Sequence, residues 1–356
     1  MNPPATQKEL EGRFAGLLLG TAVGDALGLP AEGMSPQRIQ RLWGGLWRHR
    51  FLFGGGMISD DTEHSLFVAQ ALLAHPDDAA AFERCLAWKL RLWLLGAPAG
   101  IGLATLKALL KLWAGFPPAR SGIRSAGNGP AMRSAIVGAY FADDSASRKR
   151  FVGASTRLTH TDSRAETAAL AIAEAAASAV MGDTPHTKFL MSLPDFGDDP
   201  EWKLISRKIV DAISAQASVP GFAKLMGLDR GVTGYAYHSV PVALYAWLRH
   251  PHDYRAALES ALNCGGDTDT VAAMVGAICG AARGPGSIPS EWTAHLREWP
   301  RSPAVLTRVA SRLAEQRISR RGLGPVPYFW PALILRNLIF AITVLGHGLR
   351  RALPPY

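Results

Sequence analysis

The sequence is poor in cysteine. Its 356 residues include only Cys85, Cys264 and Cys279, and their positions show none of the paired spacings typical of a zinc site. An odd, sparse set fits a reducing compartment better than a disulfide framework, so we expect a cytoplasmic protein. Charged residues make up 19% and apolar residues 48% of the chain, a globular composition that argues against extensive disorder.

Alternating runs of β-branched residues are nearly absent, which excludes a sheet-rich fold. Alanine, leucine and glycine dominate, and Pro/Gly-rich breaks separate a succession of apolar stretches. We therefore expect a single all-α domain over residues 9–315. Its helices are predicted to begin near Glu9, Thr62, Asp78, Ile101, Gly129, Arg164, Glu201, Gly234, Tyr254, Thr270 and Pro303.

Long uninterrupted apolar runs are also scarce. The first, at residues 14–23, follows a stretch in which Lys8 and Arg13 are balanced by Glu9 and Glu11. A signal peptide prefers a net basic start and a small-residue cleavage site, so the sequence argues against one here.

The C-terminal segment, residues 316–356, is a basic hinge followed by an apolar helix of unknown role. Arg336 and Asn337 interrupt its apolar stretch, which leaves too short a run to span a bilayer comfortably. We expect a terminal helix packed on the body or on a partner, with contact to a membrane surface, or a membrane-anchored scaffold, as alternatives. Removal of residues 322–356 is then expected to spare chemistry but to harm solubility, assembly or location.

Acidic charge is in deficit, with 29 Asp and Glu against 38 Lys and Arg and a net charge of +9. This excess favours anionic ligands without naming one. Neither basic cluster, residues 148–150 or residues 317–321, is interleaved with aromatic residues. We interpret both clusters as solvated surface and expect no nucleic-acid partner.

The first predicted helix carries glycine at every fourth position, at Gly16, Gly20, Gly24 and Gly28. Side chains four residues apart share one helical face, so this helix has a bare stripe on which another backbone can pack closely. We expect it in the middle of the bundle.

Two short acidic motifs are the strongest chemical signal. Ser59, Asp60 and Asp61 follow a triple glycine and precede an apolar helix pattern, and residues 265–270 read Gly-Gly-Asp-Thr-Asp-Thr before another. Hard divalent cations such as Mg²⁺ or Mn²⁺ select carboxylate and hydroxyl oxygens of this kind. A helix cap would use only one such residue, and adjacent carboxylates repel each other unless a cation compensates them.

Three other segments are weaker signals. Asp25 falls within the apolar first helix and needs a partner if buried, whereas Glu32 follows in a loop and by itself reads as a surface residue. The loop at residues 126–133 could offer backbone N–H groups to a phosphate, or be an ordinary helix start. His160, in a Thr-His-Thr-Asp segment, is by itself more often structural than functional.

Taken in order from Phe14 to Gly284, these segments resemble the ADP-ribosylglycohydrolase family. The resemblance implies a single-domain orthogonal helical bundle around a binuclear Mg²⁺ (or Mn²⁺) centre, with Glu32, Asp61 and Asp269 in catalysis. The implied metal ligands are Ser59, Asp60, Asp61, Asp267, Asp269 and Thr270. The implied substrate contacts are Gly127, Asn128, Gly129 and Met132 at the diphosphate, His160 at the distal ribose and Tyr235 at the adenine.

The resemblance also implies the reaction. It is hydrolysis of the glycosidic bond between ADP-ribose and an acceptor on a protein or a small conjugate. Arginine is the acceptor favoured slightly, and ADP-ribosyl-serine and O-acetyl-ADP-ribose are the alternatives within enzymes. A catalytically silent ADP-ribose binder is the alternative of another class, although the metal-ligating acids are all present.

Overall fold

The computed structural model describes residues 6–51, 53–182 and 186–352, which contain seventeen α-helices. The first nine are α1 (Gln7–Gly28), α2 (Pro36–Trp43), α3 (Asp60–Ala74), α4 (Ala79–Leu95), α5 (Leu103–Trp113), α6 (Ala135–Tyr140), α7 (Ser145–Arg157), α8 (Ser163–Met181) and α9 (Thr187–Ser192). The others are α10 (Pro200–Ser214), α11 (Val219–Leu225), α12 (Ala236–Arg249), α13 (Tyr254–Leu262), α14 (Thr268–Arg283), α15 (Ser290–Ala294), α16 (Pro303–Ser319) and α17 (Ala332–Ala352). In these ranges extended segments meet only at isolated bridges, so the all-α prediction is confirmed.

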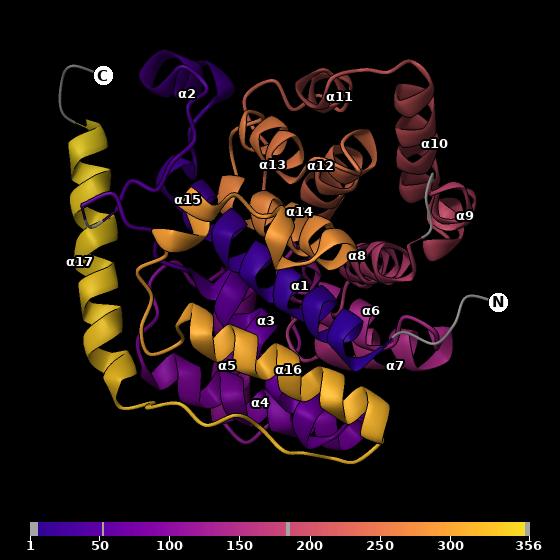
Figure 1. Ribbon diagram of the computed structural model, residues 1–356, viewed down its shortest axis with the longest axis vertical. Coiled ribbons are helices and arrows are strands. Elements are labelled where there is room, and N and C mark those ends of the chain that lie inside the picture. Colours follow the sequence, from indigo (N-terminus) through magenta and orange to yellow (C-terminus); the bar gives the residue numbers. More distant parts are fainter. Residues whose placement is uncertain (1–5, 52, 183–185, 353–356) are drawn as a thin grey trace.

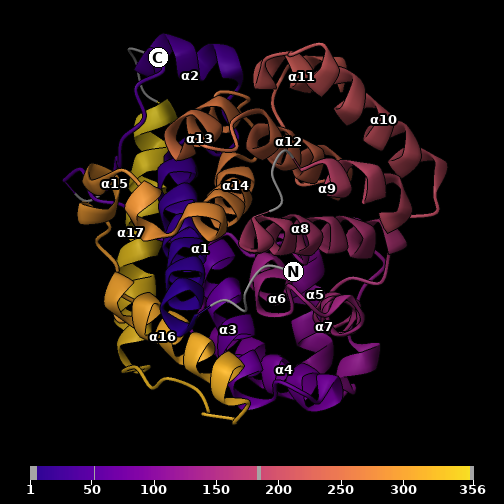
Figure 2. The ribbon, with the colours of Figure 1, turned by 45° about the vertical axis from the view of Figure 1, so that its right-hand side comes forward.

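Helices α1 and α14 lie side by side at the centre, as the views of Figure 1 and Figure 2 both show. The glycine stripe explains this contact. A Cβ atom added at Gly16, Gly20 or Gly24 would fall on a backbone carbonyl oxygen of α14. The two backbones are therefore too close for any side chain between them, and the predicted central position of α1 is confirmed.

The helices missed by the sequence analysis are short or strongly charged. They are α2, α7, α9, α11 and α15. The basic run at residues 148–150 falls within α7, and its interpretation as solvated surface is wrong for Arg148. That side chain is buried and forms an ion pair with Glu174 at 2.7 Å, while it also donates to the carbonyl oxygens of Phe141 and Ala142.

Helices α16 and α17 complete the fold, and α17 stands along the left edge of Figure 1. In the described ranges two helical stretches are long and apolar enough to cross a membrane by length and composition alone, at Gln7–Ala31 and Ala332–Arg351. The 18-residue apolar window of the first is wholly buried, as expected of a core helix. The boundary placed between residues 315 and 316 stays a prediction.

Candidate metal and substrate site

The N-terminus of α3 is held by a carboxylate of α1. Asp25 is buried and accepts hydrogen bonds from the backbone N–H groups of Ser59 (2.9 Å) and Thr62 (3.2 Å) and from the Thr62 hydroxyl. Burial raises the pKa of Asp25 to about 6, although these hydrogen bonds oppose the rise. The partner that a buried Asp25 requires is thus the start of the first acidic motif.

The N-terminus of α14 follows a turn that only glycine fits well. Gly265 and Gly266 have φ of 66° and 81°, and a Cβ on Gly266 would overlap the backbone of Val232. This turn also pairs with the loop after α1. The Gly33 N–H donates to the Gly266 carbonyl, and the Gly266 N–H donates to the Met34 carbonyl, both at 2.8 Å. The loop that carries Glu32 is therefore fixed beside the second acidic motif.

The two acidic motifs, far apart in the chain, meet in space. One carboxylate oxygen of Asp61 accepts from the Ser59 hydroxyl at 3.1 Å and from the Thr270 hydroxyl at 3.3 Å. Asp267 accepts a hydrogen bond from the Asn128 side-chain amide at 2.6 Å, which connects the loop at residues 126–133 to the same cluster. The second oxygens of Asp61 and Asp269 are buried and have no hydrogen-bond partner.

Several carboxyl groups lie close together in this cluster. Burial, and then repulsion from Asp25 and other neighbouring carboxylates, raises the pKa of Asp60 to about 8 and that of Asp61 well above its usual range. Burial and repulsion from Glu32, Asp267 and Asp61 raise the pKa of Asp269 in the same way. Buried carboxylates of this density are stable as anions only when cations compensate them.

The donor set fits hard divalent cations. It contains carboxylate and hydroxyl oxygens with two buried oxygens that lack partners. Within the described ranges no group of three or more Asp, Glu, His or Cys side chains already stands at metal-binding geometry. The acids accept hydrogen bonds from the hydroxyls of Ser59 and Thr270 and from the Asn128 side-chain amide.

A pocket of about 530 Å³ opens over the cluster. Of the predicted site residues, it is lined by Glu32, Ser59, Asp60, Gly127, Asn128, Gly129, Met132, His160, Asp267, Asp269 and Thr270. Asp61 lies buried beneath it, in contact with Thr270. Tyr235 does not line the pocket. It pairs through its backbone with Gly127 at the loop, and its hydroxyl donates to Glu201 at 2.9 Å.

Glu32 lies at the mouth of the pocket. Its side chain reaches the surface, yet partial burial and repulsion from Asp267 raise its pKa, while Arg351 opposes the rise. The Arg351 guanidinium also donates to the Glu32 backbone carbonyl at 3.0 Å. Glu32 is thus positioned with its carboxylate toward the acids and its backbone against α17.

His160 is held against the loop at residues 126–133, called the glycine loop from here on. Its ring is buried, its Nδ1 atom lies 2.9 Å from the Thr159 hydroxyl, and Cβ atoms at Gly127 or Gly129 would stand about 3.1 and 3.2 Å from it. Burial, followed by the nearby Arg133 charge, lowers the pKa of His160 to about 3. The imidazole is therefore neutral at physiological pH and can serve as a polar, uncharged contact.

A larger hollow of about 780 Å³ lies next to the C-terminal end of α17. Among the residues that the structure describes, its lining is rich in tryptophan and arginine, and Glu291 is its single carboxylate. One carboxylate among several guanidinium groups does not suit a divalent cation, so the acid-lined pocket is the better candidate.

Sequence reasoning missed the residues that α17 contributes to the acid-lined pocket. Phe340 and Val344 line it together with Leu29 and Ala99. The signal available was their spacing, since Arg336, Phe340 and Val344 recur every four residues on one helical face.

Comparison with known proteins decides the family. The sequence model of the ADP-ribosylglycohydrolase family matches residues 6–322, nearly the whole chain. The chain belongs to the ADP-ribosylglycohydrolase family. The predictions of this family and of a hydrolase of glycosyl bonds are confirmed.

Individual relatives agree with this family. The chain is 31% identical to an uncharacterized protein of Archaeoglobus fulgidus, over 81% of this chain and 93% of that one. It is 29% identical to the ADP-ribosylhydrolase ARH3 of Gallus gallus (79% and 88% covered) and 27% identical to the ADP-ribosyl-[dinitrogen reductase] glycohydrolase of Rhodospirillum rubrum (82% and 92%). A solved structure titled ADP-ribosylglycohydrolase-related protein complex superposes with a TM-score of 0.65 at 26% identity, covering 87% of this chain and 99% of that one.

Proposed function

We propose that this ADP-ribosylglycohydrolase hydrolyses the glycosidic bond between ADP-ribose and its acceptor with the help of two Mg²⁺ ions, for which Mn²⁺ could substitute. The observation that carries the proposal is the meeting of the two acidic helix starts. Asp61 of α3 and Thr270 of α14 are in contact beneath a pocket that also holds Glu32 and the glycine loop.

The ligands in this proposal are Ser59, Asp60, Asp61, Asp267, Asp269 and Thr270. Divalent cations held there would supply positive charge that polarises the ribose oxygens and a water molecule. The buried oxygens of Asp61 and Asp269 that lack partners support this role. Asp25 holds the α3 start in place through its hydrogen bonds and is a positioning residue.

Glu32 is proposed to accept a proton from the attacking water. Its raised pKa brings the carboxylate closer to the working pH of a general base than an ordinary glutamate. At the other side of the pocket, Gly127, Asn128, Gly129 and Met132 would position the diphosphate and contribute orientation rather than bond chemistry.

His160 and Tyr235 are proposed to contact the nucleoside. The neutral His160 imidazole lies against the glycine loop and suits a ribose hydroxyl. The Tyr235 ring, next to this loop, offers a flat face to the adenine, with the Arg164 guanidinium 5.7 Å from the ring centroid.

The partner is proposed to be an ADP-ribosylated protein or a small ADP-ribose conjugate in the cytoplasm. Arginine is the acceptor that we favour slightly, with serine and acetyl conjugates as alternatives, and a silent ADP-ribose binder as the alternative of another class. The names of the relatives support ADP-ribosyl conjugates in general as the substrates.

Contact of α17 with a membrane surface is a lesser proposal. It rests on the apolar side chains that the helix exposes, which are Ile334, Leu335, Leu338, Ile342, Leu345 and Leu349. Flotation of the full-length protein with anionic liposomes tests it. A protein that stays at the bottom of the gradient with every liposome composition contradicts it.

The hydrolase proposal is tested with Asp61→Asn and Asp269→Asn in the full-length protein. Each substitution keeps the side-chain shape and removes a metal-ligating charge, so we expect release of free ADP-ribose to fall by about a thousandfold or more while circular dichroism stays unchanged. Asp77→Asn is the control, because Asp77 is exposed just beyond the other end of α3. Unimpaired release by a folded Asp61→Asn or Asp269→Asn protein would refute the metal assignment.

A further inference from the structure

The hollow of about 780 Å³ beside the C-terminal end of α17 is separate from the acid-lined pocket. Among the described residues, the two cavities share no lining side chain. Helix α17 runs between them, because Phe340 and Val344 line the pocket, whereas His347, Arg350 and Arg351 line the hollow. The hollow is therefore a second candidate binding site, and the proposed hydrolysis gives it no role.

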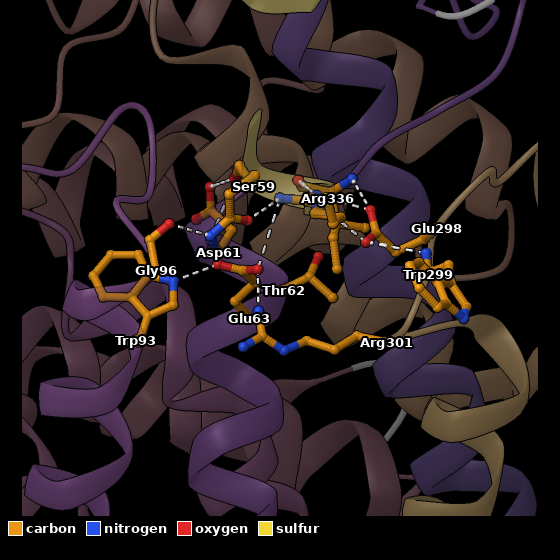
Figure 3. A network of polar contacts seen from close by, with 12 residues as sticks. Ser59, Asp61, Thr62, Glu63, Trp93, Gly96, Glu298, Trp299, Arg301 and Arg336 are labelled. Atoms are coloured by element: carbon orange, nitrogen blue, oxygen red, sulfur yellow. Dashed lines mark hydrogen bonds and ion pairs between the residues drawn. The ribbon is translucent and has the colours of Figure 1, made fainter. Parts of the chain in front are cut away.

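The walls of the hollow are fixed by contacts at both ends of α17. At the C-terminal end, which stands beside α2 in Figure 1, the Arg38 side chain donates to the backbone carbonyl of Arg351 at 2.6 Å. At the other end, Arg336 donates to Glu298 at 2.8 Å and to the backbone carbonyl of Ile58, in the network that Figure 3 shows. The helix that carries part of the lining is thus attached to the body over its whole length.

The floor of the hollow consists of buried aromatic side chains. Trp47 and Trp292 are 3% and 2% exposed, and the Trp292 indole N–H donates to the Trp47 carbonyl oxygen at 3.3 Å. The Trp47 indole N–H donates to the Asn263 side chain at 2.9 Å, and the Nε2 atom of His49 lies 2.9 Å from the Trp292 carbonyl oxygen. Because the polar atoms of the floor bind one another, the groups left for a ligand are those around it.

Positive charge surrounds this floor. Glu291, the single carboxylate among the described lining residues, forms its ion pair with Arg255. Four other guanidinium groups of the lining have no carboxylate within ion-pair distance in the described part of the chain, and they belong to Arg48, Arg50, Arg350 and Arg351. Burial and then the Arg48 charge lower the pKa of Arg50 to about 10. Several like charges around one cavity favour a ligand with several negative charges.

The arrangement of Arg50 suits a phosphate. Its guanidinium lies over the Trp43 ring, 4.0 Å from the ring centroid, and donates one hydrogen bond to the Leu46 carbonyl oxygen at 3.0 Å. A stacked guanidinium keeps its N–H groups at the edge, where they can bind phosphate oxygens in pairs. The Nε atom of Arg50 is buried and has no hydrogen-bond partner in the described part of the chain.

Aromatic and aliphatic side chains at the rim favour a ligand that is larger than inorganic phosphate. Phe53 is fully exposed there and Leu46 is 62% exposed, so neither is covered by the rest of the described chain. A free aromatic ring beside guanidinium groups is the combination on which proteins stack a nucleobase while they bind its phosphates. The volume of the hollow lies within the range of sites for small organic ligands.

We propose that this hollow binds a nucleoside polyphosphate, with the phosphates on Arg48, Arg50 and Arg350 and the base against Phe53. Arg351 adds its charge, while its N–H groups donate to the backbone carbonyls of Glu32 at 3.0 Å and of Pro30 at 3.4 Å. The site lies outside the acid-lined pocket, and the inference does not depend on the proposed hydrolysis.

The test is isothermal titration calorimetry of the full-length protein with ATP and with inorganic triphosphate, in metal-free buffer at physiological ionic strength. Arg50→Gln and Arg350→Gln remove a phosphate contact, and Phe53→Ala removes the stacking ring. The matched controls are Arg308→Gln and Phe329→Ala, which change exposed side chains outside the hollow. Asn128→Ala, in the glycine loop, reports on binding in the acid-lined pocket instead. Circular dichroism verifies that each variant is folded.

We expect a dissociation constant for ATP on the order of 10 µM. Arg50→Gln and Arg350→Gln should each weaken the binding of both ligands by about tenfold. Phe53→Ala should weaken the binding of ATP by about fivefold and that of triphosphate by less than about twofold, because only ATP carries a base. The controls and Asn128→Ala should change both affinities by less than about twofold.

Three results would overturn the inference. The first is a folded wild type that binds neither ligand. The second is ATP binding that Asn128→Ala abolishes and that Arg50→Gln and Arg350→Gln leave intact, since ATP would then occupy the acid-lined pocket. The third is equal affinity for ATP and triphosphate, both unchanged in Phe53→Ala, which would refute the nucleoside. Because Arg350 is exposed and has no ion pair in the described chain, its variant keeps the test valid even if Arg50→Gln fails to fold.

Discussion

Helices α1 and α17 have nearly the same apolar character and opposite surroundings. Their apolar windows have a mean hydropathy of 1.4 and 1.7, yet the window of α1 is 100% buried and that of α17 only 22%. Helix α1 has a glycine stripe that lets α14 pack against its backbone. Helix α17 carries leucine and isoleucine on its outer face and contacts the body along one edge.

The difference shows that apolar composition does not decide where a helix lies. Small residues permit close packing on several sides, whereas bulky side chains keep a helix at the surface unless a partner accepts them. The polar residues that interrupt α17 are its attachment points, because Arg336 binds Glu298 and the Asn337 side-chain amide donates to the Gly96 carbonyl at 2.8 Å. The following predictions test this comparison, in order of decreasing effect.

The largest effect is expected from Arg336→Met, which removes the attachment of α17. Glu298 would lose its guanidinium partner and Glu63 one of its two, although both carboxylates stay buried. We expect a loss of about 4 kcal/mol in the free energy of unfolding, measured by urea denaturation. The exposed Arg350→Met should change it by less than about 0.5 kcal/mol. A loss below about 1 kcal/mol for Arg336→Met would mean that α17 is not anchored as described.

The second effect concerns the glycine stripe of α1. In Gly20→Ala the new Cβ would fall on the backbone carbonyl of Gly276, so α1 and α14 must separate. We expect a loss of about 3 kcal/mol in unfolding free energy, with a lowered melting temperature in calorimetry. A melting temperature equal to that of the wild type would show that the two backbones are not in close contact.

The third effect is the response of the acid cluster to cations. Saturating Mg²⁺ should raise the melting temperature by about 5 °C, because it binds the folded chain and not the unfolded one. The pKa of Asp60 is raised to about 8, so the folded chain holds its protons more tightly than the unfolded chain, and the cation-free protein loses stability as pH rises toward 8. The proposed Mg²⁺ would replace those protons, so the rise in melting temperature should be larger at pH 8 than at pH 6. An equal rise in melting temperature in the double variant Asp61→Asn, Asp269→Asn would mean that the cation binds elsewhere.

The smallest effect is the counterpart of Gly20→Ala on α17. A Cβ at Gly346 meets nothing within 4 Å, so Gly346→Ala relieves the entropic cost of glycine in a helix without any collision. We expect a gain of about 0.5 kcal/mol, detectable by urea denaturation. A loss of 2 kcal/mol or more would contradict the open position of this residue.

The sequence predicted well those features that depend on local pattern. The four-residue glycine spacing predicts the central position of α1, and the residue types of the two acidic helix starts indicate a site without any knowledge of their contact. The predicted helix starts at Tyr254 and Pro303 agree with α13 and α16. Short helices such as α9 were missed because a few residues give too little periodicity.

Contacts between distant segments could not be predicted in this way. Phe340 and Val344 follow a linker of unassigned role, and their position in the pocket depends on the attachment of Arg336 beside Ile58. The expectation that residues 322–356 can be removed without loss of chemistry stays a prediction. These contacts argue that the deletion would open the pocket and expose Leu29 and Phe51.

Release of free ADP-ribose from arginine, serine and acetyl conjugates, assayed with Mg²⁺ and with excess EDTA, tests the central claim most directly. The account predicts release from at least one conjugate with Mg²⁺ and its loss with EDTA, because the buried acids of α3 and α14 need cations to act. Release at an equal rate in EDTA, or no release from any conjugate by a folded, Mg²⁺-supplied protein, would contradict it.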